Sequence, residues 1–285
     1  MAQQKDAKQS GEKFQQFMQE AMRRKVKERL STVRRKVMIL SGKGGVGKST
    51  VAVNTALALH RSGERVGLLD VDIHGPSVPA LLGIENATLR AAEDGTLLPF
   101  EFQGVKVLSV GFLLPNQDEA VIWRGPLKFQ LIRQFLGDAA WGELDFLVLD
   151  APPGTGDEPL TAVQLIPDLD GAVVVTTPQR LAALDVRKSI TFCRKLQVPI
   201  LGVVENMAGF VCPECGTVTH IFPPGGGQKI ASDMGVPFLG SIPLDPRLAE
   251  AGDQGRSFFD AFGDSPAAEA LRKVAEKVAA LGAEK

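Results

Sequence analysis

A glycine-rich run with two lysines follows an apolar segment near the start of the chain. The run Ser41–Thr50, SGKGGVGKST, satisfies G-x-x-x-x-G-K-[ST], and the helical pattern VAVNTALALH comes next. Glycines let backbone N–H groups turn inward and form an anion site at a helix start. Lys48 adds a positive charge for the outer phosphates, and the Ser49 hydroxyl can ligate Mg²⁺. The pattern predicts a phosphate-binding loop made of Gly42, Lys43, Gly44, Gly45, Val46, Gly47, Lys48, Ser49 and Thr50.

Carboxylates end two other apolar runs. Leu68-Leu69 leads into Asp70 and Asp72, which strand alternation directs to the same side. A second run ends in Asp150, and the tight turn Ala151-Pro152-Pro153-Gly154 follows. Ligands of open α/β sheets bind beyond the carboxyl ends of strands. We therefore expect Asp150 to hold Mg²⁺ directly or through water. Helix capping or turn formation is the alternative for Asp70 and Asp72.

Two thiols at C-x-x-C spacing, Cys212 and Cys215, lie in a loop just after an apolar run. Zinc needs four ligands, and this stretch adds only His220, which could equally be a surface residue. Two copies of the chain, related by a two-fold axis, would supply four thiolates for zinc or a [4Fe–4S] cluster. Spacing alone does not choose between these metals. Cys193 lies in a helical pattern and is expected in the core.

Short apolar runs alternate with helical stretches from residue 37 onward. They are nearly continuous in hydrophobicity, as buried parallel strands are, and predict a doubly wound, mostly parallel α/β sheet flanked by helices. The runs are Val37–Leu40, Val66–Leu69, Val105–Val110, Phe146–Leu149, Ala172–Thr176, Ile200–Val204 and Phe238–Ile242.

The segments outside this pattern divide the chain. Residues 1–35 are polar with apolar positions at helical spacing, so we expect a helical extension before a domain spanning 36–285. Residues 84–117, rich in Gly, Pro and Asp, predict loops or a small hairpin. Residues 267–281 predict a helix whose thin apolar stripe packs on the domain rather than on a membrane.

Composition narrows the class of protein. The net charge is -1, with 44% hydrophobic and 23% charged residues, which does not favour nucleic acid as a partner. The basic stretch 23–36 is interpreted as a solvated helix face, a binding patch being the alternative. The N-terminus is polar, and no run approaches the roughly 20 apolar residues of a membrane span. Three cysteines, an odd number, argue against a disulfide framework, so we expect a cytoplasmic protein without a membrane partner.

Lys43 and four motifs resemble those of a known protein family. Lys43, the second residue of the glycine-rich loop, marks the deviant Walker A of the MinD/Mrp group of P-loop ATPases. Residues 37 to about 262 resemble the Mrp family of iron–sulfur cluster carriers more closely. The motifs that carry this resemblance are KGGVGKST, the run 70–77 (DVDIHGPS), the run 150–157 (DAPPGTGD) and the run 205–209 (ENMAG).

The resemblance implies roles for particular residues. It implies that Lys43 reaches the nucleotide of a partner subunit, so that ATP binding produces a dimer. With Lys48, Asp72 and Asp150, it would belong to the catalytic set. Asp72 would position or activate the attacking water, and Asn206 would lie beside the adenine.

The family's cluster-binding signature, CPxCG, coincides with Cys212 and Cys215. The resemblance thus implies a slow ATPase that holds a [4Fe–4S] cluster between two subunits. The cluster would come from a scaffold or donor and pass to apoproteins. A MinD- or ParA-like positioning ATPase is the rival, although it needs no C-x-x-C pair, and a zinc-binding regulatory ATPase is a third possibility.

Many Mrp-type proteins carry a further N-terminal domain. The extension here has no cysteine, and three roles stay open for it: a tail, a dimer contact or target recruitment.

Overall fold

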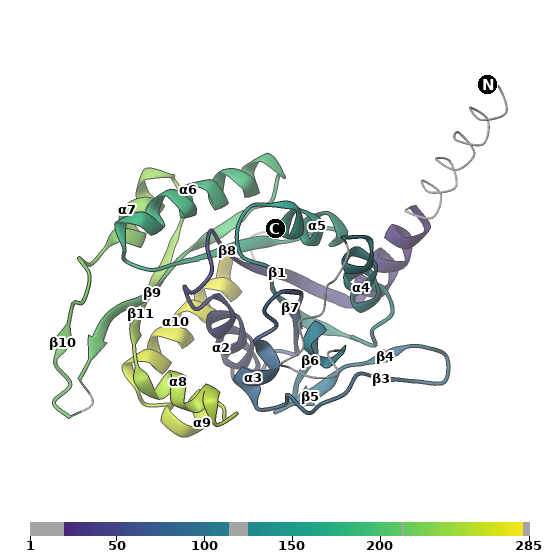
Figure 1. Ribbon diagram of the computed structural model, residues 1–285, viewed down its shortest axis with the longest axis horizontal. Coiled ribbons are helices and arrows are strands. Elements are labelled where there is room, and N and C mark those ends of the chain that lie inside the picture. The colour runs from purple at the N-terminus through teal and green to yellow at the C-terminus, as the bar shows by residue number, and fades with distance from the viewer. Residues whose placement is uncertain (1–19, 114–124, 213, 282–285) are drawn as a thin grey trace.

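The computed structural model describes residues 20–113, 125–212 and 214–281 (Figure 1). The strands are β1 Val33–Ser41, β2 Val66–Asp70, β3 Arg90–Ala91, β4 Leu97–Leu98, β5 Phe100–Phe102, β6 Val105–Ser109, β7 Leu144–Asp150, β8 Gly171–Thr176, β9 Ile200–Val211, β10 Val218–Thr219 and β11 Phe238–Leu244. The α-helices are α2 Lys48–Arg61, α3 Val78–Leu82, α4 Gly125–Gly137, α5 Asp157–Leu165, α6 Arg180–Lys195, α7 Gly226–Asp233, α8 Pro246–Asp253, α9 Phe258–Phe262 and α10 Pro266–Leu281. Residues 20–29 are helical, and 3₁₀ turns cover Leu30–Thr32 and Val110–Leu113.

The main sheet is mostly parallel. Its strand order is β10-β9-β8-β1-β7-β2-β6-β5, and β11 pairs with β9. The pairs β9–β10 and β5–β6 are antiparallel, whereas the other neighbours run parallel. All seven predicted runs form parallel strands of this sheet. The predicted fold class is therefore confirmed.

Alternation along β1 explains why helices cover both faces of the sheet. Val37 and Ile39 join one buried cluster with side chains of α2 and α10. Met38 and Leu40 join the other cluster with side chains of α4 and α5. Successive side chains of a strand point to opposite faces, so a strand buried on both faces must be apolar throughout. The uninterrupted hydrophobicity of the strand runs follows from this two-sided burial.

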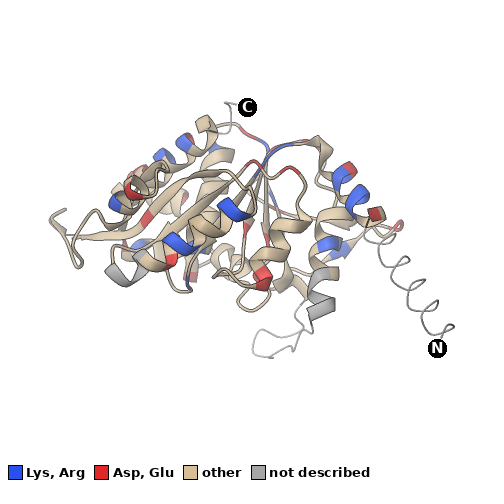
Figure 2. Cartoon of the chain, turned by 90° about the horizontal axis from the view of Figure 1, so that it is seen from above, with Lys and Arg blue, Asp and Glu red and all other residues tan. Residues whose placement is uncertain are grey.

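The helix over residues 20–29 packs on the domain through its apolar positions. Val26 and Leu30 are buried in the cluster that contains α4. The basic positions of this helix lie outside, where Arg24 and Lys27 make long ion pairs of 3.9 Å with Glu28 and Asp168. The prediction of a solvated helix face over residues 23–36 is wrong for its last part, because Arg35 and Lys36 lie on β1 and are buried. Figure 2 shows basic and acidic positions interspersed over much of the chain. β1 begins at Val33, and the domain boundary placed at residue 36 stays a prediction.

The other flanking segments follow their sequence patterns. β3 and β4 form a two-stranded antiparallel hairpin within the predicted loop region, of which residues 114–117 lie outside the described part of the chain. In α10, Leu271, Val274 and Val278 are buried in the main core, as expected for a helix that packs on the domain. Among the described residues, no helix has the length and apolarity needed to cross a membrane.

Candidate functional site

The glycine-rich loop connects β1 to α2, as its sequence context requires. Gly45 and Gly47 adopt left-handed backbone angles, with φ of 76° and 78°. Gly47 caps α2, and a Cβ there would lie 2.2 Å from the Asn206 amide nitrogen. A Cβ on Gly42 would come within 2.5 Å of the Asp185 carbonyl oxygen on α6. These close approaches exclude side chains at Gly42 and Gly47, and the loop backbone lies at the start of a helix, where anions bind.

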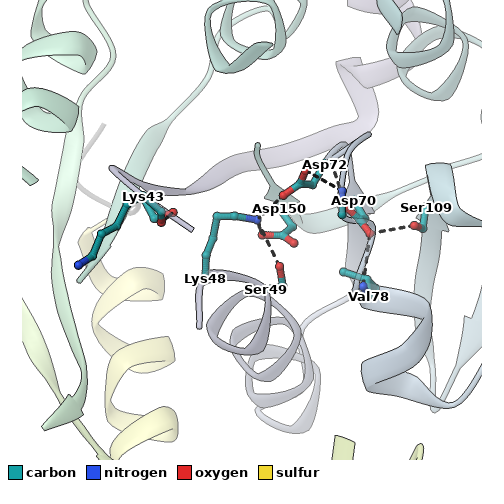
Figure 3. Close-up of polar contacts among 10 residues, drawn as sticks. Lys43, Lys48, Ser49, Asp70, Asp72, Val78, Ser109 and Asp150 are labelled. Atoms are coloured by element: carbon teal, nitrogen blue, oxygen red, sulfur yellow. Dashed lines mark hydrogen bonds and ion pairs between the residues drawn. The ribbon is translucent and has the colours of Figure 1, made fainter. Parts of the chain in front are cut away.

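Lys48 is the hub of the charged groups beside this loop. Its ammonium nitrogen lies 2.6 Å from Oδ1 of Asp150 and 3.5 Å from Oδ2 of Asp72. It also donates to the Ser49 hydroxyl over 3.2 Å. Figure 3 shows these side chains converging from α2, from the end of β7 and from the loop after β2. The parallel strands put the carboxylates together, because Asp70 and Asp150 are register partners at the carboxyl ends of β2 and β7.

Asp70 is completely buried beneath this cluster and ties the following loop to the sheet. Its carboxylate accepts hydrogen bonds from the Ser109 hydroxyl at 2.8 Å and the Asp72 N–H at 3.0 Å. The Val78 N–H, at the start of α3, adds a longer contact of 3.4 Å. Burial, with the nearby Asp150 charge as a second cause, raises the pKa of Asp70 to about 8. Asp70 thus anchors the segment that carries Asp72.

The donor set at Asp150 fits Mg²⁺. Oδ1 of Asp150 faces Lys48, while Oδ2 is buried without a hydrogen-bond partner among the described residues. Burial raises the pKa of Asp150, and the Lys48 charge opposes that rise. A buried carboxylate oxygen without a donor is costly, and a hard cation with oxygen ligands satisfies it. The Ser49 hydroxyl, close to the same lysine, supplies a second oxygen.

The turn after Asp150 and the loop after Asp72 are linked to their surroundings. The Gly154 N–H donates to the Ser41 carbonyl over 2.8 Å, which places the Pro-Pro turn beside the end of β1. His74 Nε2 lies 2.6 Å from a carboxylate oxygen of Glu158 at the start of α5. The histidine therefore joins the loop after β2 to the start of α5, two segments that border the site.

Lys43 behaves differently from Lys48. Its side chain points away from Lys48 and from the carboxylates (Figure 3). Among the described residues, no ion pair to Lys43 is formed. The direction of this side chain is compatible with the predicted reach toward another subunit, a role that stays a prediction.

Asn206 contacts the loop itself. Its amide donates to the Val46 carbonyl over 2.9 Å, and its side chain is buried. The next residue, Met207, has a φ of 60°, an uncommon conformation outside glycine. The predicted contact of Asn206 with adenine stays a prediction.

The cysteine pair lies away from the carboxylates, on the arm formed by β9 and β10 (Figure 1). Cys212 is half-buried and Cys215 is exposed. The Cys212 N–H donates to the Thr217 carbonyl, and the Gly216 N–H donates to the Cys212 carbonyl. The Thr217 hydroxyl, 3.3 Å from the Cys215 sulfur, and the Thr217 N–H hold the pKa of that thiol below its ordinary value. Cys215 is thus accessible and inclined toward the thiolate form that binds metals.

The other sequence candidates do not join a metal site. Within the described residues, no three His, Cys, Asp or Glu side chains are grouped so as to hold a metal ion. His220 is exposed beside Gly209. Cys193 is buried in the core as expected, and burial raises the pKa of its thiol to about 12.

Sequence reasoning missed two residues that the site uses. Ser109 ends β6 and binds Asp70. Glu205, buried beside Asn206, accepts a hydrogen bond from the Gly227 N–H. The sequence did contain a signal for Ser109. It is a polar residue near the end of an apolar strand run, as Asp70 and Asp150 are, and the carboxyl ends of parallel strands meet at one edge of the sheet.

Comparison with known proteins establishes the family. The chain matches a family model described as ParA: NUBPL iron-transfer P-loop NTPase, over residues 32–279. The chain belongs to this family. The membership confirms the predicted resemblance and makes the chain a P-loop NTPase of the iron-transfer type.

Individual relatives of this NUBPL-type chain cover most of its length. An iron-sulfur cluster carrier protein of Methanocaldococcus jannaschii is 51% identical, over 89% of this chain and 87% of the relative. A cytosolic Fe-S cluster assembly factor NUBP2 homolog of Nematostella vectensis is 47% identical, over 89% and 95%. The solved structure of a nucleotide-binding protein from Archaeoglobus fulgidus in complex with ADP is 42% identical, with a TM-score of 0.74 over 83% of this chain and 92% of that one.

Proposed function

We propose that this NTPase is an ATP-dependent iron–sulfur cluster carrier that works as a homodimer. The observation that carries the proposal is the presence, in one domain, of a complete P-loop with its carboxylates and an accessible thiol pair without further ligands among the described residues. The names of the relatives as carrier and assembly factor support the cargo assignment. The cargo is a [4Fe–4S] cluster, delivered to apoproteins and received from a scaffold or donor.

The chain's own groups would bind Mg·ATP in a defined way. The backbone from Gly42 to Gly47 holds the phosphates. The Lys48 ammonium turns away from Asp150 and Asp72 and toward the outer oxygens of the phosphates. Ser49 and the partnerless oxygen of Asp150 hold Mg²⁺, which when bound supplies positive charge against the phosphates.

Hydrolysis uses Asp72 and a second subunit. Asp72 orients a water whose oxygen bonds to the γ-phosphorus as the bond from that phosphorus to ADP breaks, and both protons of the water leave with inorganic phosphate as dihydrogen phosphate. Lys43 from the other subunit stabilises the charge on the transferred group. The reaction is slow, since a carrier uses hydrolysis to reset its conformation. The homodimer therefore forms when ATP is bound.

The thiols hold the cargo at the subunit boundary. Two copies of Cys212 and Cys215 supply the four thiolates that a [4Fe–4S] cluster requires. Transfer is a ligand exchange: each Fe–S bond to the carrier is replaced by one to a recipient cysteine, and the recipient's thiol proton moves to the released thiolate. No electron is exchanged. Cys215 is exposed, so a recipient thiolate can reach the cluster.

The setting that suits this chemistry is the cytoplasm, where thiols stay reduced. The cytosolic assembly factor among the relatives supports this location. No membrane or nucleic acid takes part in the proposed cycle.

Anaerobic reconstitution with iron and sulfide tests the proposal. We expect visible absorption of a [4Fe–4S] cluster and about four irons per dimer in the wild type. The double variant Cys212→Ala with Cys215→Ala should bind none. Cys193→Ala is the matched control and should load normally, because that thiol is buried in the core.

The stoichiometry separates the alternatives. About one zinc per dimer and no cluster would replace the carrier assignment with a zinc-stabilised ATPase. A wild type that binds neither metal but hydrolyses ATP would contradict the proposal and favour a positioning ATPase.

A further inference from the structure

Two adjacent residues of β9 contact two different functional segments. Asn206 donates to the carbonyl of Val46 in the phosphate-binding loop over 2.9 Å. The fit is close, since a Cβ on Gly47 would collide with the Asn206 amide. Asn206 is only 4% exposed, so water does not replace this contact. A displacement of the Val46 carbonyl is therefore transmitted to β9.

Glu205 points away from Asn206, as neighbours on a strand do, and contacts the start of α7. Its carboxylate accepts a hydrogen bond of 2.5 Å from the Gly227 N–H. A longer contact of 3.4 Å comes from the Ser241 hydroxyl. A Cβ on Gly226 would lie 2.9 Å from the Pro178 carbonyl oxygen, and a Cβ on Gly227 would lie 2.9 Å from the Glu205 Cβ. The glycines thus allow the helix start to lie directly on this buried carboxylate, whose exposure is 1%.

The cysteine loop lies between these two attachments in the sequence. One end continues β9 through Val211 into Cys212, and the other returns through Gly225 into α7. β9 therefore fixes one end directly and the other through Glu205. A shift or twist of β9 at residues 205–206 reaches both ends of the loop that carries the thiols.

We propose that Asn206 and Glu205 are positioning residues that couple occupancy of the phosphate-binding loop to the exposure and reactivity of Cys212 and Cys215. The coupling rests on the proposed function for its biological use, because it lets the nucleotide state regulate how firmly the cargo is held. The coupling can be measured in protein that holds no cluster. Nucleotide binding moves the Val46 carbonyl, Asn206 passes the movement to β9, and Glu205 carries it to the far end of the thiol loop.

Thiol alkylation in the metal-free, full-length chain measures this coupling. The rate of iodoacetamide modification at Cys212 and Cys215 is followed by mass spectrometry, with and without saturating Mg·ADP. ADP is used at a protein concentration where light scattering shows monomers, so that subunit contacts do not shield the thiols. We expect ADP to change the wild-type rate by about fivefold or more, the lower range of coupling between two sites.

The variants test each link. Asn206→Ala and Glu205→Ala should bring the rate ratio close to one at saturating ADP, with occupancy verified by a fluorescent nucleotide. Glu205→Gln should restore the ratio, since its amide oxygen can still accept from the Gly227 N–H. Lys229→Ala is the control, because within the described part of the chain the exposed Lys229 side chain of α7 pairs with Asp233 alone. A merely structural role of Glu205 would change stability without abolishing the response to nucleotide.

Two results would overturn the coupling: a wild-type ratio of one, or a wild-type ratio retained in both alanine variants. If Glu205→Ala does not fold, hydrogen exchange of the wild type decides instead, and ADP must alter protection of the peptides containing Cys212 and Gly227. Failure of cluster reconstitution would contradict the carrier function alone. The alkylation result stands independently of it.

Discussion

At the scale of single residues, charge balance determines what the site accepts. One ammonium, Lys48, faces Asp72 and Asp150, with Asp70 buried behind them. Burial raises the pKa values of Asp70 and Asp150, and the neighbouring carboxylates, three around one ammonium, add to the rise. A divalent cation would offset this excess and free Lys48 for phosphate. We therefore expect the site to bind a nucleotide together with its metal ion.

Asp72→Asn should separate catalysis from binding. The amide keeps the size of the side chain but loses the charge that orients and polarises the water, so we expect ATP hydrolysis to fall by about 100-fold or more. ADP affinity should change by less than about threefold, since the loop backbone is intact. Steady-state phosphate release and ADP titration measure the two effects. The control is Asp94→Asn, which changes an exposed carboxylate in the β3–β4 hairpin. If Asp72→Asn lowers ADP binding and the hydrolysis rate equally, Asp72 has a structural role instead.

Thr217→Val should shift the pH dependence of Cys215 alkylation upward. The Thr217 hydroxyl and N–H favour the thiolate and lower the pKa of Cys215. A lowered pKa gives more thiolate, and faster alkylation, on the acidic side of the ordinary thiol range. Valine removes the hydroxyl, so a given rate is reached only at higher pH, and alkylation at about pH 7 slows. Thr219→Val in β10 serves as the control, and an unchanged profile in Thr217→Val would show that the Thr217 hydroxyl does not contribute to the lowered pKa.

At the scale of elements, the connection from β1 to α2 combines backbone conformation with contact to β9. Gly47 has a φ of 78° and touches Asn206, whereas Gly44 has no positive φ and a Cβ there would meet no atom within 4 Å. The same sequence motif therefore contains glycines with different physical requirements. Gly47 is fixed by packing, while Gly44 is exposed and available to a ligand.

Gly47→Ala should destabilise the protein before any nucleotide is added. The left-handed conformation and the clash with Asn206 together cost about 1–3 kcal/mol. Thermal unfolding without nucleotide should show a lower Tm for Gly47→Ala than for Gly44→Ala, which has space for its methyl group. Equal melting temperatures for the two variants would contradict the packing argument.

At the scale of the whole molecule, the proposed function needs a second copy of the chain at both the nucleotide site and the thiols. Lys43 points away from its own carboxylates, and the described residues supply Cys212 and Cys215 with no further ligands. A second copy can complete both arrangements by the same two-fold symmetry. This shared requirement connects ATP-dependent assembly with cargo holding.

Lys43→Ala should abolish this assembly. In an Asp72→Asn background, which slows hydrolysis, Mg·ATP should convert the protein to a dimer, and adding Lys43→Ala should leave it monomeric. In the otherwise wild-type chain, Lys43→Ala should lower ATP hydrolysis by about tenfold or more, because a positive charge beside the transferred group is lost. Light scattering and phosphate release are the measurements. Lys273→Ala on α10 is the control, and a dimer formed without Lys43 would sink the predicted reach across subunits.

The sequence by itself determined the sheet and the nucleotide loop, for local physical reasons. Two-sided burial demands uninterrupted apolar strands, and the glycine pattern has few alternatives once a strand precedes it and a helix follows. Asp150 could be placed because parallel strands end at a common edge. The family resemblance, carried by the motifs around Lys43, Asp72, Asp150 and Asn206, was confirmed by the family match.

Only the tertiary structure decided which side chains meet across long sequence separations. Ser109 binds Asp70, Asn206 binds the Val46 carbonyl, and Glu205 holds the start of α7. None of these pairs follows from periodicity, because strand order and register, rather than sequence distance, bring their partners together. Hydrophobic pattern specifies elements, whereas the contacts that link nucleotide loop, strand and thiols exist only once those elements have packed.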